Sequence, residues 1–234
     1  MKKNIFFAMI LAMVTFALTS CGDKDSEGKS RFTYYPLLEL EGDATFVVAK
    51  GSTYQDPGYK ATLNGEDVSS KVTVSSNVNT SKSGVYTVVY SIMNDDGISA
   101  NAKRKVVVLD LNNAVEGFYL NQASGNRVYN GNTLAYGKNF EILILGNDDG
   151  SYTVDDLFGG WYCQRAGYGT NYAMGGVIVI GDDGSVSCQG SKVPGWGDSL
   201  DDFYGTYDAA TKTFNVVAVY NGNTMFFNQT WVKE

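Results

Sequence analysis

The sequence contains no histidine. Histidine is the side chain that most often acts as a general base near neutral pH and as a ligand of transition metals. Its absence excludes the nucleophile pairs Ser-His and Cys-His. Three cysteines alone are also too few to complete an ordinary four-ligand zinc site. We therefore expect that the protein is not an enzyme and that it holds no metal and no cofactor.

Basic residues are also scarce. The chain of 234 residues has 18 Lys and Arg against 25 Asp and Glu, which gives a formal net charge of −7. A nucleic-acid partner requires Lys and Arg to replace the counterions of its phosphates. The charge balance argues against nucleic acid as a partner, and equally against a polybasic patch that binds membranes.

Proline is rare, with 3 in the chain, whereas glycine is abundant, with 27. No segment sustains the period of an amphipathic helix. Short alternating segments lie between clusters of Gly, Asn and Asp, which is typical of strands joined by tight turns. The sequence therefore predicts an all-β protein, and its length allows one or two domains at about 100–200 residues each.

The chain has one long apolar run, at its beginning. Lys2 and Lys3 precede the apolar stretch from Ile5 to Leu18, and small residues then lead to Cys21. A positive start, an apolar core and small residues before a cleavage point are the features of a secretory signal peptide. The run is shorter than the roughly 20 residues that cross a membrane. Plain secretion and a retained anchor are the alternatives.

With a cysteine directly after Leu18-Thr19-Ser20, this segment resembles the lipobox of bacterial lipoproteins. The resemblance implies a signal peptide at 1–20, cleavage before Cys21, lipid on its thiol and a tether over 21–36. Asp23, Asp25 and Glu27 resemble the export signal of Bacteroidetes surface lipoproteins. They imply an outer membrane location facing the medium, and the periplasmic face is the alternative.

Two cysteines remain, Cys163 and Cys188. Beyond the inner membrane such a pair can form a disulfide that persists. Both lie in apolar, aromatic segments that look like strands, so two buried free thiols are the other interpretation. The sequence leaves both states open.

Residues 37–110 have the pattern of a small sandwich. Strands are predicted at Leu37–Leu40, Thr45–Ala49, Val72–Ser75, Ser83–Ile92 and Ala102–Leu109. Short strands at this spacing, separated by turn signals such as Asp56-Pro57-Gly58, favour two packed sheets.

Several residues of this region resemble an immunoglobulin-like repeat of bacterial surface proteins. They are Tyr54, Asp56-Pro57-Gly58, Ala61, the run Ser83-Gly84-Val85-Tyr86-Thr87-Val88-Val89-Tyr90, Asp96-Gly97 and Arg104. The resemblance implies an immunoglobulin-like domain that acts as a spacer, in which these positions form turns and core.

Residues 114–234 form a second region, beyond a short polar joint at Asp110–Asn113. Strands are predicted at Val115–Leu120, Phe140–Leu145, Ser151–Val154, Trp161–Arg165, Val177–Ile180, Ser185–Gln189, Asp202–Tyr207, Thr213–Tyr220 and Thr224–Val232, with Asn126–Tyr136 irregular. About eight antiparallel strands fit a compact barrel or a two-sheet sandwich.

The two regions together resemble a two-domain lipoprotein family of Bacteroides whose function is uncharacterised. The residues that suggest this are Gly159-Gly160-Trp161-Tyr162, Gly181-Asp182-Asp183-Gly184, Gly205-Thr206-Tyr207-Asp208 and Thr211-Lys212-Thr213-Phe214. The resemblance implies a lipocalin-like β domain after the immunoglobulin-like one.

Aromatic residues in Gly-rich segments are the best candidates for binding. Aromatic faces bury apolar area, and Tyr and Trp keep a polar group, which suits the C–H faces and hydroxyls of sugars. The candidates are Trp161, Tyr162, Tyr168, Tyr172, Trp196 and Tyr204, with Asp198 among the polar residues nearby. Aromatic residues in strands usually belong to the core, but Trp196 lies between two glycines after Pro194, as at the tip of a loop.

The paired carboxylates are weaker candidates. Asp155-Asp156, Asp182-Asp183 and Asp201-Asp202 are neighbours in sequence, and neighbours on a strand point to opposite faces. A glycosidase requires two carboxyl groups across a cleft. Neither Asp148-Asp149-Gly150 nor Asp182-Asp183-Gly184 continues as a calcium-binding loop.

The sequence therefore favours a lipoprotein that binds an extracellular glycan through residues 114–234, with outer-membrane uptake proteins as implied partners. A structural or protein-interaction lipoprotein, and a carrier of a small apolar ligand inside a barrel, are the alternatives. The membrane is reached through the lipid on Cys21.

Overall fold

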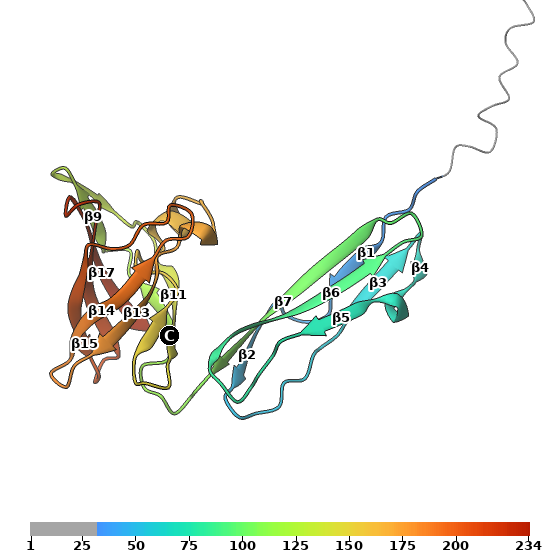
Figure 1. Cartoon of the computed structure of the whole chain (residues 1–234), viewed down its shortest axis with the longest axis horizontal. Helices are drawn as coiled ribbons and strands as arrows, with labels where there is room; N and C mark the ends of the chain where they lie inside the picture. Colours follow the sequence, from blue (N-terminus) through green and yellow to red (C-terminus); the bar gives the residue numbers. More distant parts are fainter. Residues whose placement is uncertain (1–31) are drawn as a thin grey trace, which may run out of the picture.

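The computed structural model describes residues 32–234. The predicted signal peptide, Cys21 and the first part of the tether lie outside the described residues. Within residues 32–234, no helix is long and apolar enough to span a membrane. The described chain is all-β, as predicted, and its strands form two separate β units (Figure 1).

The first unit is a sandwich of two sheets, as the immunoglobulin-like resemblance implied. One sheet has the order β1-β3-β4 and the other β2-β7-β6-β5. The strands are β1 Leu37–Leu40, β2 Thr45–Ala49, β3 Tyr59–Leu63, β4 Glu66–Asp67, β5 Thr73–Ser76, β6 Gly84–Met93 and β7 Ser99–Leu109. Alternating residues of β6 and β7, including Val88, Tyr90, Val106 and Val108, are buried between the sheets.

The Asp-Pro-Gly turn is structural in this unit. The Asp56 carboxylate accepts the Gly58 N–H at 2.9 Å, the Tyr90 hydroxyl and the Arg104 guanidinium. Arg104 is fully buried, and a buried charge needs such partners because it has left water. Gly58 has φ +102°, which a residue with a Cβ rarely adopts.

The second unit is a closed antiparallel barrel of eight strands, which resolves the choice between barrel and sandwich. The sheet runs β8, β11, β12, β13, β14, β15, β16, β17, and β17 pairs back onto β8. The strands are β8 Gly117–Asn121, β11 Phe140–Gly146, β12 Tyr152–Val154, β13 Gly175–Ile180, β14 Ser185–Lys192, β15 Asp202–Asp208, β16 Thr213–Tyr220 and β17 Met225–Lys233.

The barrel interior is filled by large side chains. Those that are almost completely buried include Tyr119, Phe158, Phe203, Phe214, Phe227 and Trp231. Barrels of about eight strands are just wide enough for side chains to fill them. The observed packing gives no support to the alternative of an apolar ligand carried inside the barrel.

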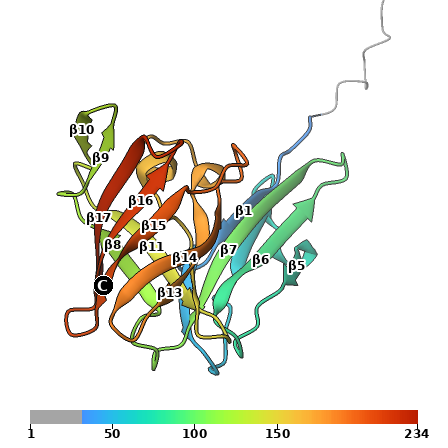
Figure 2. The ribbon, with the colours of Figure 1, turned by 60° about the vertical axis from the view of Figure 1, so that its left-hand side comes forward.

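Two predicted segments of the barrel unit were wrong. Asn126–Tyr136 is not irregular but a hairpin of β9 Asn126–Tyr129 and β10 Asn132–Ala135, which projects beyond the barrel wall (Figure 2). Its turn, Asn130-Gly131, has positive φ at both residues, as a type I′ hairpin turn requires. The segment Trp161–Arg165 is a π-helical turn rather than a strand.

The two units are joined by a short, well-packed linker. Val107 and Leu109 of β7 pack against Leu143 of β11, and all three are buried. The buried Glu116 carboxylate accepts the N–H of Asp110 at 3.0 Å and that of Gly146 at 3.1 Å. The barrel is therefore fixed to the sandwich by apolar contacts and by the Glu116 carboxylate, whose two oxygens each accept a backbone N–H.

Candidate functional site

The barrel has two different ends, because its strands alternate in direction. Tight turns at 147–150, 181–184 and 209–212 lie at the same end as the linker. The long connections 122–139, 155–174 and 193–201 lie at the opposite end, which we call the far end. The β9–β10 hairpin marks the far end, and the linker leaves from the other (Figure 1).

Asp156 organises the longest far-end connection. Its buried carboxylate accepts the N–H groups of Phe158, Gly160 and Met174 at 2.9–3.0 Å and the thiol of Cys163 at 3.0 Å. Burial raises the pKa of Asp156, although these four donors oppose the rise. The carboxylate is therefore occupied by donors from its own loop.

Two glycines explain why the chain turns into a π-helical turn here. Gly159 and Gly160 have φ of +62° and +84°, and a Cβ on Gly160 would meet the Phe140 side chain at 2.5–2.8 Å. The turn is closed by the Arg165 N–H, which donates to the Gly160 carbonyl at 2.8 Å. π-Helical turns of this kind occur often at functional sites.

The two adjacent aromatic residues of this turn, Trp161 and Tyr162, differ in burial. Trp161 is 3% exposed and packs in the core against Tyr136, with the guanidinium groups of Arg127 and Arg165 within 4.8 and 4.3 Å of its ring centre. The structure therefore places Trp161 in the core rather than on the surface. Tyr162 is only half-buried: its ring centre is 6.0 Å from that of the core residue Phe227 and 4.8 Å from that of the exposed Trp196.

Four aromatic rings meet at the far end and form a closed circuit, which we call the aromatic cup. Successive ring centres are 6.2 Å apart for Tyr162–Tyr168, 5.5 Å for Tyr168–Tyr172, 5.0 Å for Tyr172–Trp196 and 4.8 Å for Trp196–Tyr162. Tyr168, Tyr172 and Trp196 line an open cavity of about 330 Å³. Tyr168 is 56% and Trp196 40% exposed.

Local backbone contacts hold the cup together. The Gly195 N–H donates to the Asn171 carbonyl at 2.7 Å, which joins the two loops that carry Tyr172 and Trp196. A Cβ on Gly195 would meet the Tyr172 ring at 2.7–2.9 Å, so glycine is required for this close approach. The Tyr162 hydroxyl is anchored by a contact of 3.3 Å to the Met225 sulfur.

The remaining predicted binding residues lie outside the cup. Asp198 follows Trp196 closely, and its carboxylate accepts the Tyr220 hydroxyl at 2.7 Å, so it holds the loop. Tyr204 is 48% exposed on β15, where it pairs with Ser187, and no ring contact joins it to the cup among residues 32–234. Sequence reasoning missed the part that Tyr220 plays in fixing Asp198.

The two cysteines are free thiols, so the disulfide that the sequence left open is not formed in this structure. Cys163 donates to Asp156, and the Cys188 sulfur contacts the Gly190 carbonyl at 3.2 Å. Burial, followed by the nearby Asp156 carboxylate, raises the pKa of the Cys163 thiol. A thiol with a raised pKa is a poor nucleophile.

The carboxylate pairs lie in different parts of the barrel. Asp183 accepts the Ser185 N–H at 2.9 Å in a tight turn at the linker end, whereas Asp156 is enclosed at the far end. Within residues 32–234, no group of three or more Cys, Asp or Glu side chains is placed to hold a metal ion.

Comparisons with known proteins agree with this architecture. A family model of the bacterial surface protein Ig-like domain matches residues 38–108, and a family model of a C-terminal domain matches residues 108–233. No curated protein matches the chain.

Among solved structures, the chain is similar to the lipoprotein BT2262 from Bacteroides thetaiotaomicron. The two share 34% identity over 85% of this chain and 100% of that one, with a TM-score of 0.75. A lipoprotein relative together with a surface-protein domain indicates a surface-associated protein of the cell envelope.

Two structures of ZmpB from Clostridium perfringens also match. One holds its M60 catalytic domain with CBM51-1 and CBM51-2, with 16% identity over 90% of this chain and 23% of that one. The other holds CBM51-2 in complex with GlcNAc and INT domains, with 15% identity over 84% and 43%. Their TM-scores are 0.29 and 0.28, too low to support any inference about a site.

Proposed function

The chain belongs to the same family as the lipoprotein BT2262, and on that premise we propose that it is a non-catalytic surface lipoprotein that binds an extracellular glycan. In this proposal, lipid on Cys21 anchors the chain in the outer membrane. The immunoglobulin-like unit is the spacer, and the far end of the barrel is the binding surface.

The aromatic cup is the observation that carries this proposal. Three of its rings line an open cavity, and two of them are more than a third exposed. Exposing a group of large aromatic side chains to water is unfavourable, and such exposed apolar patches often mark binding sites. Their flat faces complement the C–H faces of sugar rings, and the Tyr and Trp polar groups complement sugar hydroxyls.

The absence of catalysis is supported by the chemistry of the residues around the cup. The chain has no histidine. Asp156 is enclosed by four donors, and Asp198 accepts the Tyr220 hydroxyl. Neither carboxylate is arranged to donate or abstract a proton at a glycosidic bond, which requires two carboxyl groups on either side of it.

Outer-membrane uptake proteins are the proposed partners, because a surface protein that captures a glycan has to pass it on. A structural or protein-interaction role is the alternative function. It predicts that one envelope protein co-purifies in a fixed stoichiometry and that no sugar binds. Co-purification together with glycan binding therefore separates the two functions.

A glycan array followed by affinity electrophoresis tests the proposal. The purified chain should bind at least one glycan, and Trp196→Ala should weaken that binding by about tenfold or more. Tyr35→Ala is the matched control, because Tyr35 is an exposed aromatic residue outside the barrel. Failure of every glycan to bind, or equal binding by Trp196→Ala, would falsify the assignment of the cup.

A further inference from the structure

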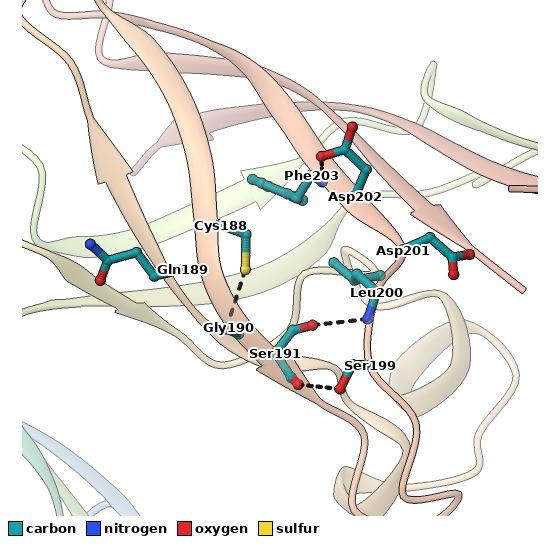
Figure 3. Close-up of a pocket in the computed structure, with 9 residues that line it drawn as sticks. All are labelled: Cys188, Gln189, Gly190, Ser191, Ser199, Leu200, Asp201, Asp202 and Phe203. Atoms are coloured by element: carbon teal, nitrogen blue, oxygen red, sulfur yellow. Dashed lines mark hydrogen bonds between the residues drawn. The ribbon is translucent and has the colours of Figure 1, made fainter. Parts of the chain in front are cut away.

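The barrel wall is open between β14 and β15. Within the described chain, these strands pair only through Ser185–Ser187 and Tyr204–Thr206, whereas β15 pairs with β16 along its whole length. Beyond the last pair, toward the far end, residues 188–191 and 199–203 border a cavity of about 310 Å³, which we call the notch (Figure 3).

A β-bulge causes this opening. Ile178 of β13 pairs with Cys188, but the preceding Val177 pairs with Gly190, so Gln189 is an extra residue on β14. A bulge bends its strand and disrupts the ladder, and the pairing of β14 with β15 ends at Ser187, directly before the bulged segment. The glycine inside the strand was the available sequence signal for a bulge.

The notch is closed again on its far-end side by hydrogen bonds of side chains rather than by strand pairing. The Ser199 hydroxyl donates to the Ser191 carbonyl at 2.8 Å, and the Leu200 N–H donates to the Ser191 hydroxyl at 2.9 Å (Figure 3). The gap is therefore a defined feature of the fold, with hydrogen bonds at both limits.

The chemistry of the notch suits an uncharged polar ligand. The lining is mostly polar: it includes Gln189, Ser191 and Ser199, and the facing backbones of 188–191 and 201–203 are not paired with each other as strands. The lining has two carboxylates, Asp201 and Asp202, and no Lys or Arg. Carboxylate, sulfate or phosphate groups would meet like charge without a cation to compensate. Hydroxyl and amide groups would meet donors and acceptors.

The notch is close to the cup. Trp196 precedes Ser199 by three residues, so their Cα atoms are at most about 11 Å apart. At the other limit of the notch, the exposed Tyr204 pairs with Ser187. From Ser187 to Ser191 the strand advances about 13 Å, which is longer than one sugar ring. Aromatic residues therefore lie at both ends of a polar gap.

We propose that the notch is a second binding site for the glycan held by the cup, and that it takes the neighbouring sugar of an uncharged oligosaccharide. This proposal rests on the proposed function of the cup. It adds that the ligand has at least two sugar units, is neutral rather than a uronic or sulfated glycan, and runs along β14 and β15 toward Tyr204.

Filling the notch tests this proposal. A Cβ on Gly190 would have no heavy atom within 4 Å, and Gly190 has no positive φ, so Gly190→Leu should fit. Gly175→Leu is the matched control, because its Cβ would meet only backbone oxygens at 3.9–4.0 Å and it does not line the notch. Gly190→Val, with a shorter side chain, is the second variant if the first fails to fold.

The measurement is calorimetric titration with a neutral oligosaccharide, its monosaccharide and an acidic oligosaccharide of equal length. The unchanged chain should bind the neutral oligosaccharide about tenfold more tightly than the monosaccharide. Gly190→Leu should lower the affinity for the oligosaccharide to that for the monosaccharide, and Gly175→Leu should change neither.

The outcomes separate the two proposals. If the Gly190 variants bind the oligosaccharide normally while Trp196→Ala does not, the cup is retained and the notch is rejected. Tighter binding of the acidic oligosaccharide also rejects the notch as a neutral site. If the unchanged chain binds no sugar of any kind, the cup is rejected and the notch with it.

Discussion

The two ends of the barrel are made by the same eight strands but are built differently. At the linker end, Asp149, Asp183 and Asp208 each accept a backbone N–H two residues later, and each forms a tight turn. At the far end, three of the four connections are long, the fourth being the tight turn at 221–224, and the longest is organised around the buried Asp156. The comparison shows that strand pairing sets the barrel, whereas loop length decides which end can carry a binding site.

The two ends also use tight packing for different purposes. Leu143, in the middle of β11, is buried against β7 of the sandwich, and the buried Glu116 at the linker end accepts the N–H groups of Asp110 and Gly146. At the far end, Trp161 is buried to support rings that remain exposed, including Trp196. We expect substitutions at the linker end to affect the attachment of the barrel to the sandwich. At the far end, we expect substitutions of buried residues to affect stability and substitutions of exposed residues to affect binding.

The largest effect is expected from Trp161→Ala. Replacing a buried tryptophan by alanine removes its apolar contacts and leaves a cavity, which costs about 3–5 kcal/mol. The free energy of unfolding from denaturant titrations measures this loss. A change below about 1 kcal/mol would show that Trp161 does not support the far end.

Asp156→Ala should follow, with a loss of about 3 kcal/mol, because the buried N–H groups of Phe158, Gly160 and Met174 would each lose their acceptor. Asp156→Asn keeps one oxygen and should lose less. The same unfolding titrations rank the two variants. Equal losses of unfolding free energy would mean that the oxygen kept by Asn contributes nothing, which would contradict the role of both carboxylate oxygens.

Glu116→Ala should cost about 2 kcal/mol, because two backbone donors at the linker lose their acceptor. Glycan affinity should remain unchanged, since the far end is not involved. Calorimetric unfolding together with a binding titration checks both parts. A loss of affinity as large as that of Trp196→Ala would remove the functional distinction between the ends.

The smallest effect concerns pH. Hydrogen bonds from the side chains of Ser151, Ser185 and Thr211 lower the pKa of Asp149, Asp183 and Asp208 respectively. A carboxyl whose pKa is lower in the folded chain stabilises the fold above its unfolded value and loses this contribution as pH falls. The three turns should therefore weaken below about pH 4.

The triple variant Asp149→Asn, Asp183→Asn, Asp208→Asn should have a melting temperature that depends less on pH between about 5 and 2 than that of the unchanged chain. Identical acid dependence of the two proteins would show that other carboxyls control the acid transition.

Most of the strands could be predicted from alternation and turn residues, and Thr213–Tyr220 matches its predicted bounds. The hairpin at Asn126–Ala135 was missed because its strands are short and polar, although Asn130-Gly131 marks its turn. The π-helical turn at Trp161–Arg165 could not be predicted, because it depends on the packing of Gly160 against Phe140, which is remote in sequence.

The candidate site was predicted in part. A cluster of aromatic residues in Gly-rich loops pointed to Tyr162, Tyr168, Tyr172 and Trp196, which do meet. Their closed arrangement depends on two loops that a single hydrogen bond joins, and sequence does not show which loops become neighbours. For the same reason, the burial of Trp161 beside the exposed Tyr162 could not be predicted.

The central claim is that the far-end cup holds the glycan, and quenching of tryptophan fluorescence tests it most directly. Of the three tryptophans, Trp161 and Trp231 are buried and Trp196 is 40% exposed, so acrylamide should quench Trp196 selectively. A saturating glycan should protect this fraction of the emission, and Trp196→Phe should abolish both the quenching and the protection. Undiminished quenching of Trp196 with glycan bound would contradict the account.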